Sequence, residues 1–251
     1  MPVTRENLLS ELDALLQPHR FRDYCPNGLQ VEGCAEIGRL VSGVTASQAL
    51  LDAAVEAKAD AVLVHHGYFW KSEDPCIRGM KGRRIRTLIE ANINLYAYHL
   101  PLDCHPELGN NAGLGRAMGL KTFGLVDPQD VSLPLFVGEF DAERAQSSVA
   151  EQLEAALGRT VLSEGQHGVW RVAWCTGGGQ GYIDAAADAG ADLFVSGEVS
   201  EQTIHVARER NIGFIAAGHH ATERFGAQAV GDWLAKRLGI QHEFIDIANP
   251  A

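Results

Sequence analysis

An internal repeat is the feature that most constrains the fold of this chain. The stretch Ala-Val-Glu-Ala-Lys-Ala-Asp-Ala-Val-Leu-Val at 54–64 is matched by Ala-Ala-Asp-Ala-Gly-Ala-Asp-Leu-Phe-Val-Ser at 186–196. Asn92-Ile93 and Asn211-Ile212 match as well, each opening an apolar run. One long-period repeat indicates two related halves rather than a short-period solenoid.

Within this repeat, short apolar runs alternate with amphipathic helical segments. Helices are expected at 4–17, 47–58, 82–92, 142–157, 180–189, 200–210 and 221–237. Strands are expected at 40–45, 61–65, 93–98, 133–140, 160–163, 169–176, 192–196, 212–216 and 242–247. Strands that alternate with helices are typical of α/β proteins with crossover connections. We therefore predict an α/β fold of two similar βαβ-containing halves with a cleft between them.

The same pattern gives a domain plan. Residues 1–124 form the first α/β half, residues 125–165 a β-α-β insert, and residues 166–251 the second half. No low-complexity linker separates these pieces, so we expect the two halves to pack as one unit.

Composition excludes several classes of protein. The chain has 251 residues, 46% of them hydrophobic, and a net charge of −11, which disfavours sequence-independent nucleic-acid binding. It has no apolar run near the ~18 residues that a membrane span needs and no signal-peptide pattern, so we expect a soluble, cytoplasmic protein. The basic run at 81–86 is either a solvated helix face, a local phosphate site or a subunit contact. Five scattered cysteines without a Cys-x-x-Cys spacing argue against disulfides and a thiolate zinc site.

Two histidine motifs carry the chemistry. His65 and His66 end the apolar strand Ala-Val-Leu-Val, and His219 follows the strand that ends at Ala216-Ala217-Gly218. Glu223 comes four residues after His219, so both side chains lie on one helix face. Ligands in open α/β sheets sit beyond the carboxyl ends of strands, so these groups are expected at one rim.

The pattern predicts a dinuclear metal site. Adjacent residues on a strand point to opposite sides, so His65 and His66 suit two ions better than one. We assign one ion to His66, Asp103 and Glu223, and the other to His65, His219 and Glu223. Two divalent cations that share a water make a nucleophile near neutral pH. Imidazole and carboxylate ligands suit iron, zinc, manganese or cobalt, and the spacing does not choose among them.

Other polar residues are candidates for supporting roles. His99, His105 and His220 are candidates for outer-sphere or proton-transfer roles. Glu198 occupies the place in the repeat that a histidine of the first half holds, so it either faces the same cleft or is an exposed carboxylate. The remaining histidines are expected to be structural or exposed: His19, His167, His205 and His242.

A run of three glycines follows one of the expected strands. Gly177, Gly178 and Gly179 follow a strand and are either a phosphate or substrate loop or a tight turn. The run fails the dinucleotide-binding pattern because Tyr182 stands where the last glycine is required. No Gly-x-Ser-x-Gly elbow is present, which argues against a serine hydrolase.

The motifs together resemble a known family, the Nif-three-like proteins, which are also called GTP cyclohydrolase I type 2 homologues. The resemblance covers the whole chain and is close to the short bacterial members. It is carried by Pro26-Asn27-Gly28-Leu29-Gln30-Val31, Val64-His65-His66-Gly67, His99-Leu100-Pro101-Leu102-Asp103, Gly177-Gly178-Gly179, Ser196-Gly197-Glu198-Val199-Ser200 and Gly218-His219-His220-Ala221-Thr222-Glu223. It implies a Nif-three-like fold, two divalent cations per subunit on His65, His66, Asp103, His219 and Glu223, and a toroidal homohexamer.

The resemblance also implies an activity. The family name implies that water attacks C8 of a guanine ring, with ring opening and release of formate. We expect a dinuclear metal-dependent hydrolase of this cyclohydrolase type, acting on a purine nucleotide or related heterocycle, with Glu198 or His99 transferring protons. The alternatives are a metal-dependent phosphoesterase, whose phosphate the glycine run would suit, and a non-catalytic metal-binding or metal-delivery ring protein.

Overall fold

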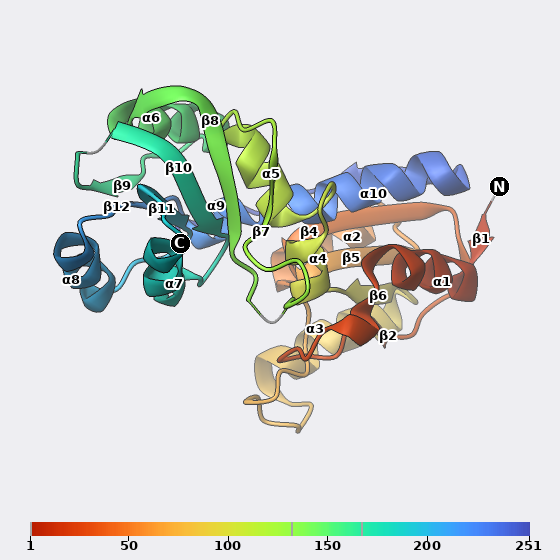
Figure 1. Ribbon diagram of the computed structural model, residues 1–251. Coiled ribbons are helices and arrows are strands. Elements are labelled where there is room, and N and C mark those ends of the chain that lie inside the picture. The colour runs from red at the N-terminus through yellow and green to blue at the C-terminus, as the bar shows by residue number, and fades with distance from the viewer. Residues whose placement is uncertain (1, 132, 167) are drawn as a thin grey trace. The chain divides into compact units, whose positions relative to one another are not determined.

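The structure, a computed structural model, describes residues 2–131, 133–166 and 168–251, so His167 lies outside the described residues. The chain forms two compact units (Figure 1). The first contains Met1–Leu102 and Gly226–Ala248, and the second contains Asp103–Phe225 and Asn249–Ala251. The predicted division at 124/125 and 165/166 follows the repeat and stays a prediction.

The first unit is built on a five-stranded sheet in the order β13-β4-β5-β6-β2. Strands β13, β4, β5 and β6 are parallel, and β2 pairs with β6 in the antiparallel direction. The strands are β2 (Gly28–Val31), β4 (Arg39–Thr45), β5 (Ala61–His66), β6 (Asn94–Ala97) and β13 (Gln241–Phe244), and the small pair β1 (Val3–Thr4) and β3 (Glu36–Ile37) forms a second sheet. The helices are α1 (Arg5–Leu16), η1 (Pro18–Arg20), α2 (Gln48–Glu56), α3 (Gly79–Glu90) and α10 (Arg224–Leu238).

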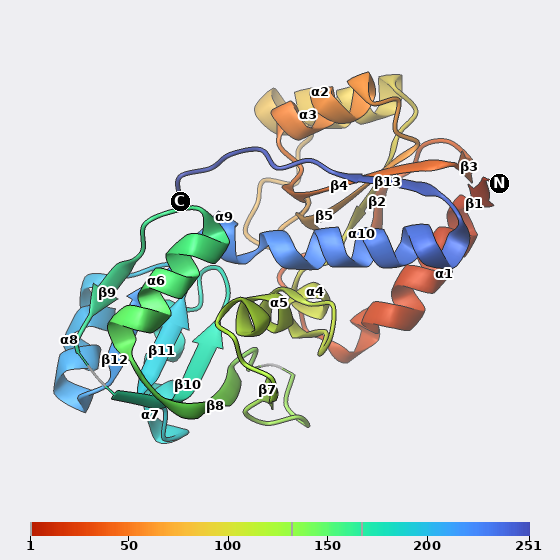
Figure 2. The same cartoon turned by 90° about the horizontal axis from the view of Figure 1, so that it is seen from above.

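Helices cover both faces of this sheet (Figure 2). Leucines and alanines of α2 and α3 pack with valines of β4 and β5 in one apolar cluster. On the other face lies α1, whose buried leucines recur every four residues, at Leu8, Leu12 and Leu16. Tyr98 donates a hydrogen bond to Asp13 Oδ1 at 2.5 Å, which fixes α1 on that face.

The second unit is built on a six-stranded sheet in the order β7-β8-β10-β11-β12-β9. The central strands β10, β11 and β12 are parallel, and β8 and β9 flank them in the antiparallel direction. The strands are β7 (Phe123–Leu125), β8 (Phe136–Ala145), β9 (Leu162–Glu164), β10 (Gly168–Cys175), β11 (Leu193–Ser196) and β12 (Gly213–Ala216). The helices are α5 (Asn110–Ala117), α6 (Gln146–Leu157), η2 (Gln180–Tyr182), α7 (Ile183–Asp188), α8 (Glu201–Arg210) and α9 (His219–Thr222).

Two apolar clusters cover the two faces of the second sheet. One gathers residues of α5 and α6 around Trp174 of β10. The other gathers residues of α7 and α8 around Phe194 of β11 and Phe214 of β12. The α/β prediction is therefore confirmed, and no helix among the described residues is long and apolar enough to cross a bilayer.

The parallel strands decide where polar side chains emerge. In the first unit, β5 ends at His65-His66, and Tyr98-His99 follow β6 on the adjacent strand. In the second unit, β10, β11 and β12 end at Cys175, Ser196 and Ala216. The carboxyl ends of neighbouring parallel strands meet at one edge of a sheet, so each unit gathers its candidate residues at such an edge.

A buried histidine ties three elements of the first unit together. His242 of β13 donates from Nδ1 to Asp232 of α10 at 2.8 Å, and its Nε2 accepts from Ser42 Oγ of β4 at 2.8 Å. These are the contacts of a Ser–His–Asp triad. Ser42 is wholly buried and lies within a strand that pairs on both sides, so no substrate reaches it. The role of His242 is structural.

We predict that Gly231→Ala destabilises the protein by about 1–2 kcal/mol, although alanine is the better helix former by about 1 kcal/mol. A Cβ at Gly231 would lie closer than 3.0 Å to three atoms of the His242 ring, which two hydrogen bonds hold in place. Urea unfolding measures the change. The control is Gly82→Ala in α3, whose Cβ would make only ordinary contacts, the nearest at 3.4 Å, and which should be neutral or slightly stabilising. Equal effects at both glycines would contradict the prediction.

Candidate metal-binding site

Three imidazoles form a cluster at the carboxyl edge of the first sheet. His65 and His66 end β5, and His99 follows β6. The ring of His65 lies 4.5 Å from that of His66 and 5.0 Å from that of His99, measured between centroids. Each of the three offers a ring nitrogen within 4.8 Å of the others, so the group could hold a metal ion.

An oxygen atom lies against Nδ1 of every one of these rings. His65 Nδ1 donates to the carbonyl of Tyr98 at 3.1 Å, and His99 Nδ1 donates to Asp23 Oδ1 at 2.7 Å. His66 Nδ1 lies 3.3 Å from Thr45 Oγ1. A neutral imidazole that donates from Nδ1 carries its lone pair on Nε2. The rings of His65 and His99, whose partners can only accept, are therefore set in the tautomer that a metal ligand needs.

Asp23 is the most strongly held of these partners. Its carboxylate accepts hydrogen bonds from the His99 ring, the Asn27 side chain, and the backbone amides of Tyr24 and Leu100. Burial would raise the pKa of Asp23, but the hydrogen bond from the His99 ring and those from the other donors outweigh it and lower the pKa to about 2. Asp23 is thus a permanent anion, and it fixes the orientation of His99.

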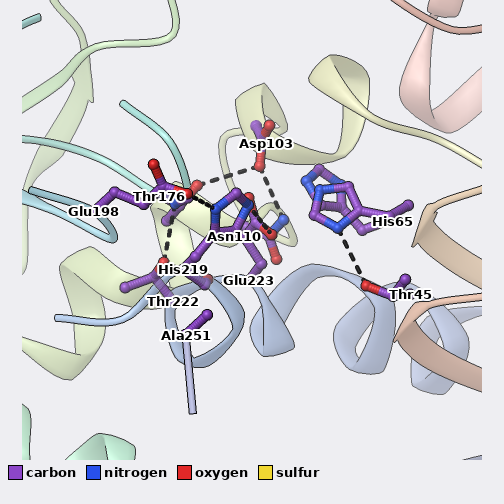
Figure 3. A network of polar contacts seen from close by, with 12 residues as sticks. Thr45, His65, Asp103, Asn110, Thr176, Glu198, His219, Thr222, Glu223 and Ala251 are labelled. Atoms are coloured by element: carbon purple, nitrogen blue, oxygen red, sulfur yellow. Dashed lines mark hydrogen bonds and ion pairs between the residues drawn. The ribbon is translucent and has the colours of Figure 1, made fainter. Parts of the chain in front are cut away.

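In the second unit, Asp103 lies in a polar and buried setting. Asn110 Nδ2 donates to Asp103 Oδ1 at 2.9 Å, and Thr176 Oγ1 donates to the same oxygen at 3.2 Å (Figure 3). Asp103 belongs to α4 (Leu100–Cys104) and is the first residue of the second unit. Asp103 is 7% exposed, and two side chains of the unit fix the direction of its carboxylate.

His219 and Glu223 form the other half of the second unit's site. His219 Nδ1 lies 2.7 Å from Glu198 Oε1, and its Nε2 lies 3.2 Å from Glu223 Oε2 (Figure 3). The hydrogen bond to Glu223, supported by that to Glu198, raises the pKa of His219 to about 9. A proton thus bridges His219 and the buried Glu223, and a divalent cation could take its place.

The expected single helix at 221–237 is broken at Glu223, between α9 and α10. At this break the Glu223 carboxylate lies close against the backbone of Gly177. The approach is so close that a Cβ at Gly177 would collide with Glu223 Oε1. Gly177 also has a φ of 63°, which glycine adopts without strain.

Close packing also requires a glycine at 179 but not at 178. A Cβ at Gly179 would meet Cys175 Sγ at 2.5 Å, and one at Gly178 would lie 3.8 Å from Glu198. Close packing accounts for Gly177 and Gly179 without a phosphate but not for Gly178. The phosphate or substrate role of Gly177, Gly178 and Gly179 stays a prediction.

Each predicted site residue therefore has a defined place within its own unit. The first unit gathers His65, His66 and His99, and the second gathers Asp103, Glu198, His219 and Glu223 around Thr176 and Gly177. Glu198 orients His219, while a proton-transfer role of Glu198 or His99 stays a prediction. His105 instead accepts from the backbone amides of Glu107 and Leu108, so it holds a turn.

Sequence reasoning missed the oxygen partners. These partners lie outside the histidine motifs in the sequence, and only the fold brings them to the rings and carboxylates. They are Asp23, Thr45, Asn110 and Thr176. Asp23 stands just before the Pro26-Asn27-Gly28 stretch, which was the available signal.

Fold and side chains thus define an α/β protein with histidine and carboxylate groups that could bind metal ions. The family model described as Duf34/NIF3 (NGG1p interacting factor 3) matches residues 3–250. The chain belongs to this family, which confirms the resemblance seen in the sequence.

Relatives and solved structures agree with this membership. A Pseudomonas aeruginosa protein named GTP cyclohydrolase 1 type 2 homolog is 55% identical over 252 residues, 100% of both chains. A Haemophilus influenzae protein of the same name is 54% identical and covers 94% of this chain and 95% of its own. The structure titled protein ybgI, unknown function, has a TM-score of 0.94 and 52% identity over 99% of this chain and 100% of its own. TTHA1606 from Thermus thermophilus has a TM-score of 0.85 and 35% identity over 99% of this chain and 100% of its own.

We predict that His219 in the metal-free protein titrates near pH 9 and that Glu223→Gln lowers its pKa toward the ordinary value of 6.5, because Glu223 is the largest cause of the shift. The raised pKa stabilises the fold fully below pH 6.5, and this contribution is lost as pH rises through about 9. NMR titration of the imidazole signals measures it, with the exposed His205 as the control. A His219 pKa near 6.5 in both proteins would contradict the prediction.

Proposed function

We propose that the chain is a dinuclear metal-dependent hydrolase of the GTP cyclohydrolase type 2 kind, acting on a purine nucleotide or a related heterocycle through metal-activated water. The observation that carries the proposal is the common setting of the four imidazoles. His65, His99 and His219 each have Nδ1 bonded to a carbonyl or carboxylate oxygen, and His66 has a hydroxyl in that place. Oxygen partners of this kind are typical of metal-ligating histidines.

The proposed ligands are His65, His66, Asp103, His219 and Glu223, with Glu223 shared by both ions. His65 and His66 belong to the first unit, and Asp103, His219 and Glu223 belong to the second.

The chemistry of these residues fits hydrolysis. When bound, two divalent cations lower the pKa of water to about 7 and so supply hydroxide near neutral pH. Glu198 holds His219 in the ligating tautomer, and Asp23 does the same for His99. We propose His99 and Glu198 as the groups that pass protons to the opening ring.

The substrate class rests on the relatives, which are named GTP cyclohydrolase 1 type 2 homolog. Attack of water at C8 of guanine opens the five-membered ring, and addition of a second water releases C8 as formate. A phosphoesterase is the second candidate in sequence, but the glycine run that would hold its phosphate lies against the carboxylates of Glu223 and Glu198, which repel an anion. We therefore prefer the cyclohydrolase, and we propose the toroidal homohexamer of the family resemblance as its assembly.

We predict about two divalent ions per chain, and a sharp loss of metal in His65→Ala and Glu223→Ala with the fold intact. Elemental analysis measures the ions, and circular dichroism checks the fold. His205→Ala is the control, because His205 is an exposed histidine on α8. Unchanged metal content in both ligand variants would remove the assignment.

The reaction is tested on the same preparations with a panel of purine nucleotides. Formate without phosphate supports the cyclohydrolase, and phosphate without formate supports the phosphoesterase. Neither product from a metal-loaded protein supports the non-catalytic role.

We predict that Glu198→Gln weakens metal binding by about 10- to 100-fold while the fold stays stable, because the partner of the His219 Nδ1 loses its charge. Competition with a chromophoric chelator measures the affinity. Glu201→Gln nearby, at an exposed position that pairs only loosely with His205, should leave the affinity unchanged. Equal affinities in the two variants would show that Glu198 does not act through His219.

A further inference from the structure

Two aromatic side chains flank the imidazole cluster of the first unit. The Trp70 ring lies 5.0 Å from the His99 ring and 5.8 Å from the His66 ring, measured between centroids. The Tyr24 ring lies 6.2 Å from that of His99. Tyr24 is 58% exposed, although its ring contacts that of His99. The two rings thus present aromatic surface to solvent next to the candidate metal ligands.

The loops that carry these rings are tied to each other. Lys71 N donates to Tyr24 O at 2.8 Å, and Lys71 Nζ donates to Asp23 O at 2.5 Å. Trp70 Nε1 donates to the carbonyl of Gly67 at 3.3 Å, which holds the indole over its own turn. Both aromatic residues therefore stand on a preorganised pair of loops, which lowers the entropy cost of binding a ligand there.

The turn before Trp70 is also held in an uncommon conformation. Phe69 has a φ of 65°, which is rare for a bulky residue, and its amide donates to Glu73 Oε2 at 2.9 Å. Conformations of this kind persist only where surrounding contacts enforce them, and they gather at ligand sites.

Asp23 couples the aromatic rings to the imidazoles. The carboxylate that accepts from the His99 ring also accepts from the backbone amide of Tyr24 at 2.6 Å. The position of Tyr24 and the orientation of His99 therefore depend on one buried anion. This arrangement fixes Tyr24 at a set place relative to the imidazole that could bind a metal ion.

We propose that Tyr24 and Trp70 form an aromatic platform that stacks a planar heteroaromatic ring of the substrate beside His66 and His99. The inference rests on the proposed function, because it names the part of the site that would hold the base. Stacking of a base on an aromatic side chain is worth about 1–3 kcal/mol and tolerates different bases. The platform would thus select flat ring systems over ring-free phosphates.

The test uses the metal-loaded protein as purified and measures binding by calorimetry. The probes are guanosine monophosphate and, as its ring-free counterpart, ribose 5-phosphate. Tyr24→Leu and Trp70→Leu should each weaken binding of guanosine monophosphate by about 5- to 150-fold and leave ribose 5-phosphate unchanged. Tyr24→Phe and Trp70→Phe keep a ring and should retain most of the affinity.

Trp170→Leu is the matched control, because Trp170 is 52% exposed on β10 in the other unit. The inference is overturned when wild-type protein does not bind guanosine monophosphate, when the leucine variants bind it as Trp170→Leu does, or when both probes lose affinity equally. Metal content and formate release are measured on each preparation. If the leucine variants retain metal, formate release and full affinity for guanosine monophosphate, the platform is contradicted and the proposed function is not. If the protein binds guanosine monophosphate through these rings but holds no metal, the proposed function is contradicted and the platform is not.

Discussion

The hydrogen bond from imidazole Nδ1 to a fixed oxygen is the interaction on which the candidate site depends. A histidine ring that lacks such a bond exchanges tautomers and turns about its side-chain bonds. For His65 the oxygen is the carbonyl of Tyr98, which follows β6. Val64 pairs with Ala97, and Tyr98 N donates to Val64 O, so the register of two parallel strands places that carbonyl beside the ring. The sheet thus sets the tautomer.

In the second unit, the close approach of three loops places a fixed oxygen beside the Nδ1 atom of His219. Glu198 N donates to Gly177 O at 3.1 Å, and Gly218 N donates to Gly197 O at 2.9 Å, so the loops after β10, β11 and β12 continue the pairing of their strands. A Cβ at Gly197 would meet Gly177 O at 2.5 Å and His219 Cα at 2.8 Å. Only glycine allows this approach, which brings Glu198 within hydrogen-bond distance of His219.

The sequence predicted the parts of the fold where pattern and length are unambiguous. The leucines of α1, the serine cap of α2 and the apolar run of β5 all gave elements within a few residues of those observed. Helix α5 was missed because its Gly113 and Gly115 have low helix propensity. Tertiary packing overrides that propensity, since a Cβ at Gly115 would meet the Trp174 ring at 2.7 Å.

For the candidate site, the sequence locates some residues and misses their partners for a similar reason. The positions of His65, His66 and His99 follow from strand ends, which periodicity locates well. Their partners do not, because Asp23 and Thr45 reach the rings through loop conformation and strand pairing that no local pattern encodes. The break between α9 and α10 was hidden for the same reason, since the residues around Glu223 are ordinary helix formers while its carboxylate packs on Gly177.

Two histidines, His219 and His242, have a polar partner at both ring nitrogens, but they differ in the charge of those partners and in exposure to solvent. His242 lies between the neutral hydroxyl of Ser42 and the carboxylate of Asp232, and its side chain is 2% exposed. His219 lies between the carboxylates of Glu198 and Glu223, and its side chain is 29% exposed. Around His219, two carboxylates beside an imidazolium leave a net negative charge that a divalent cation would balance better than a proton does. The bonding patterns are alike, but the second carboxylate and the greater solvent access distinguish His219, which could bind a metal ion, from the structural His242.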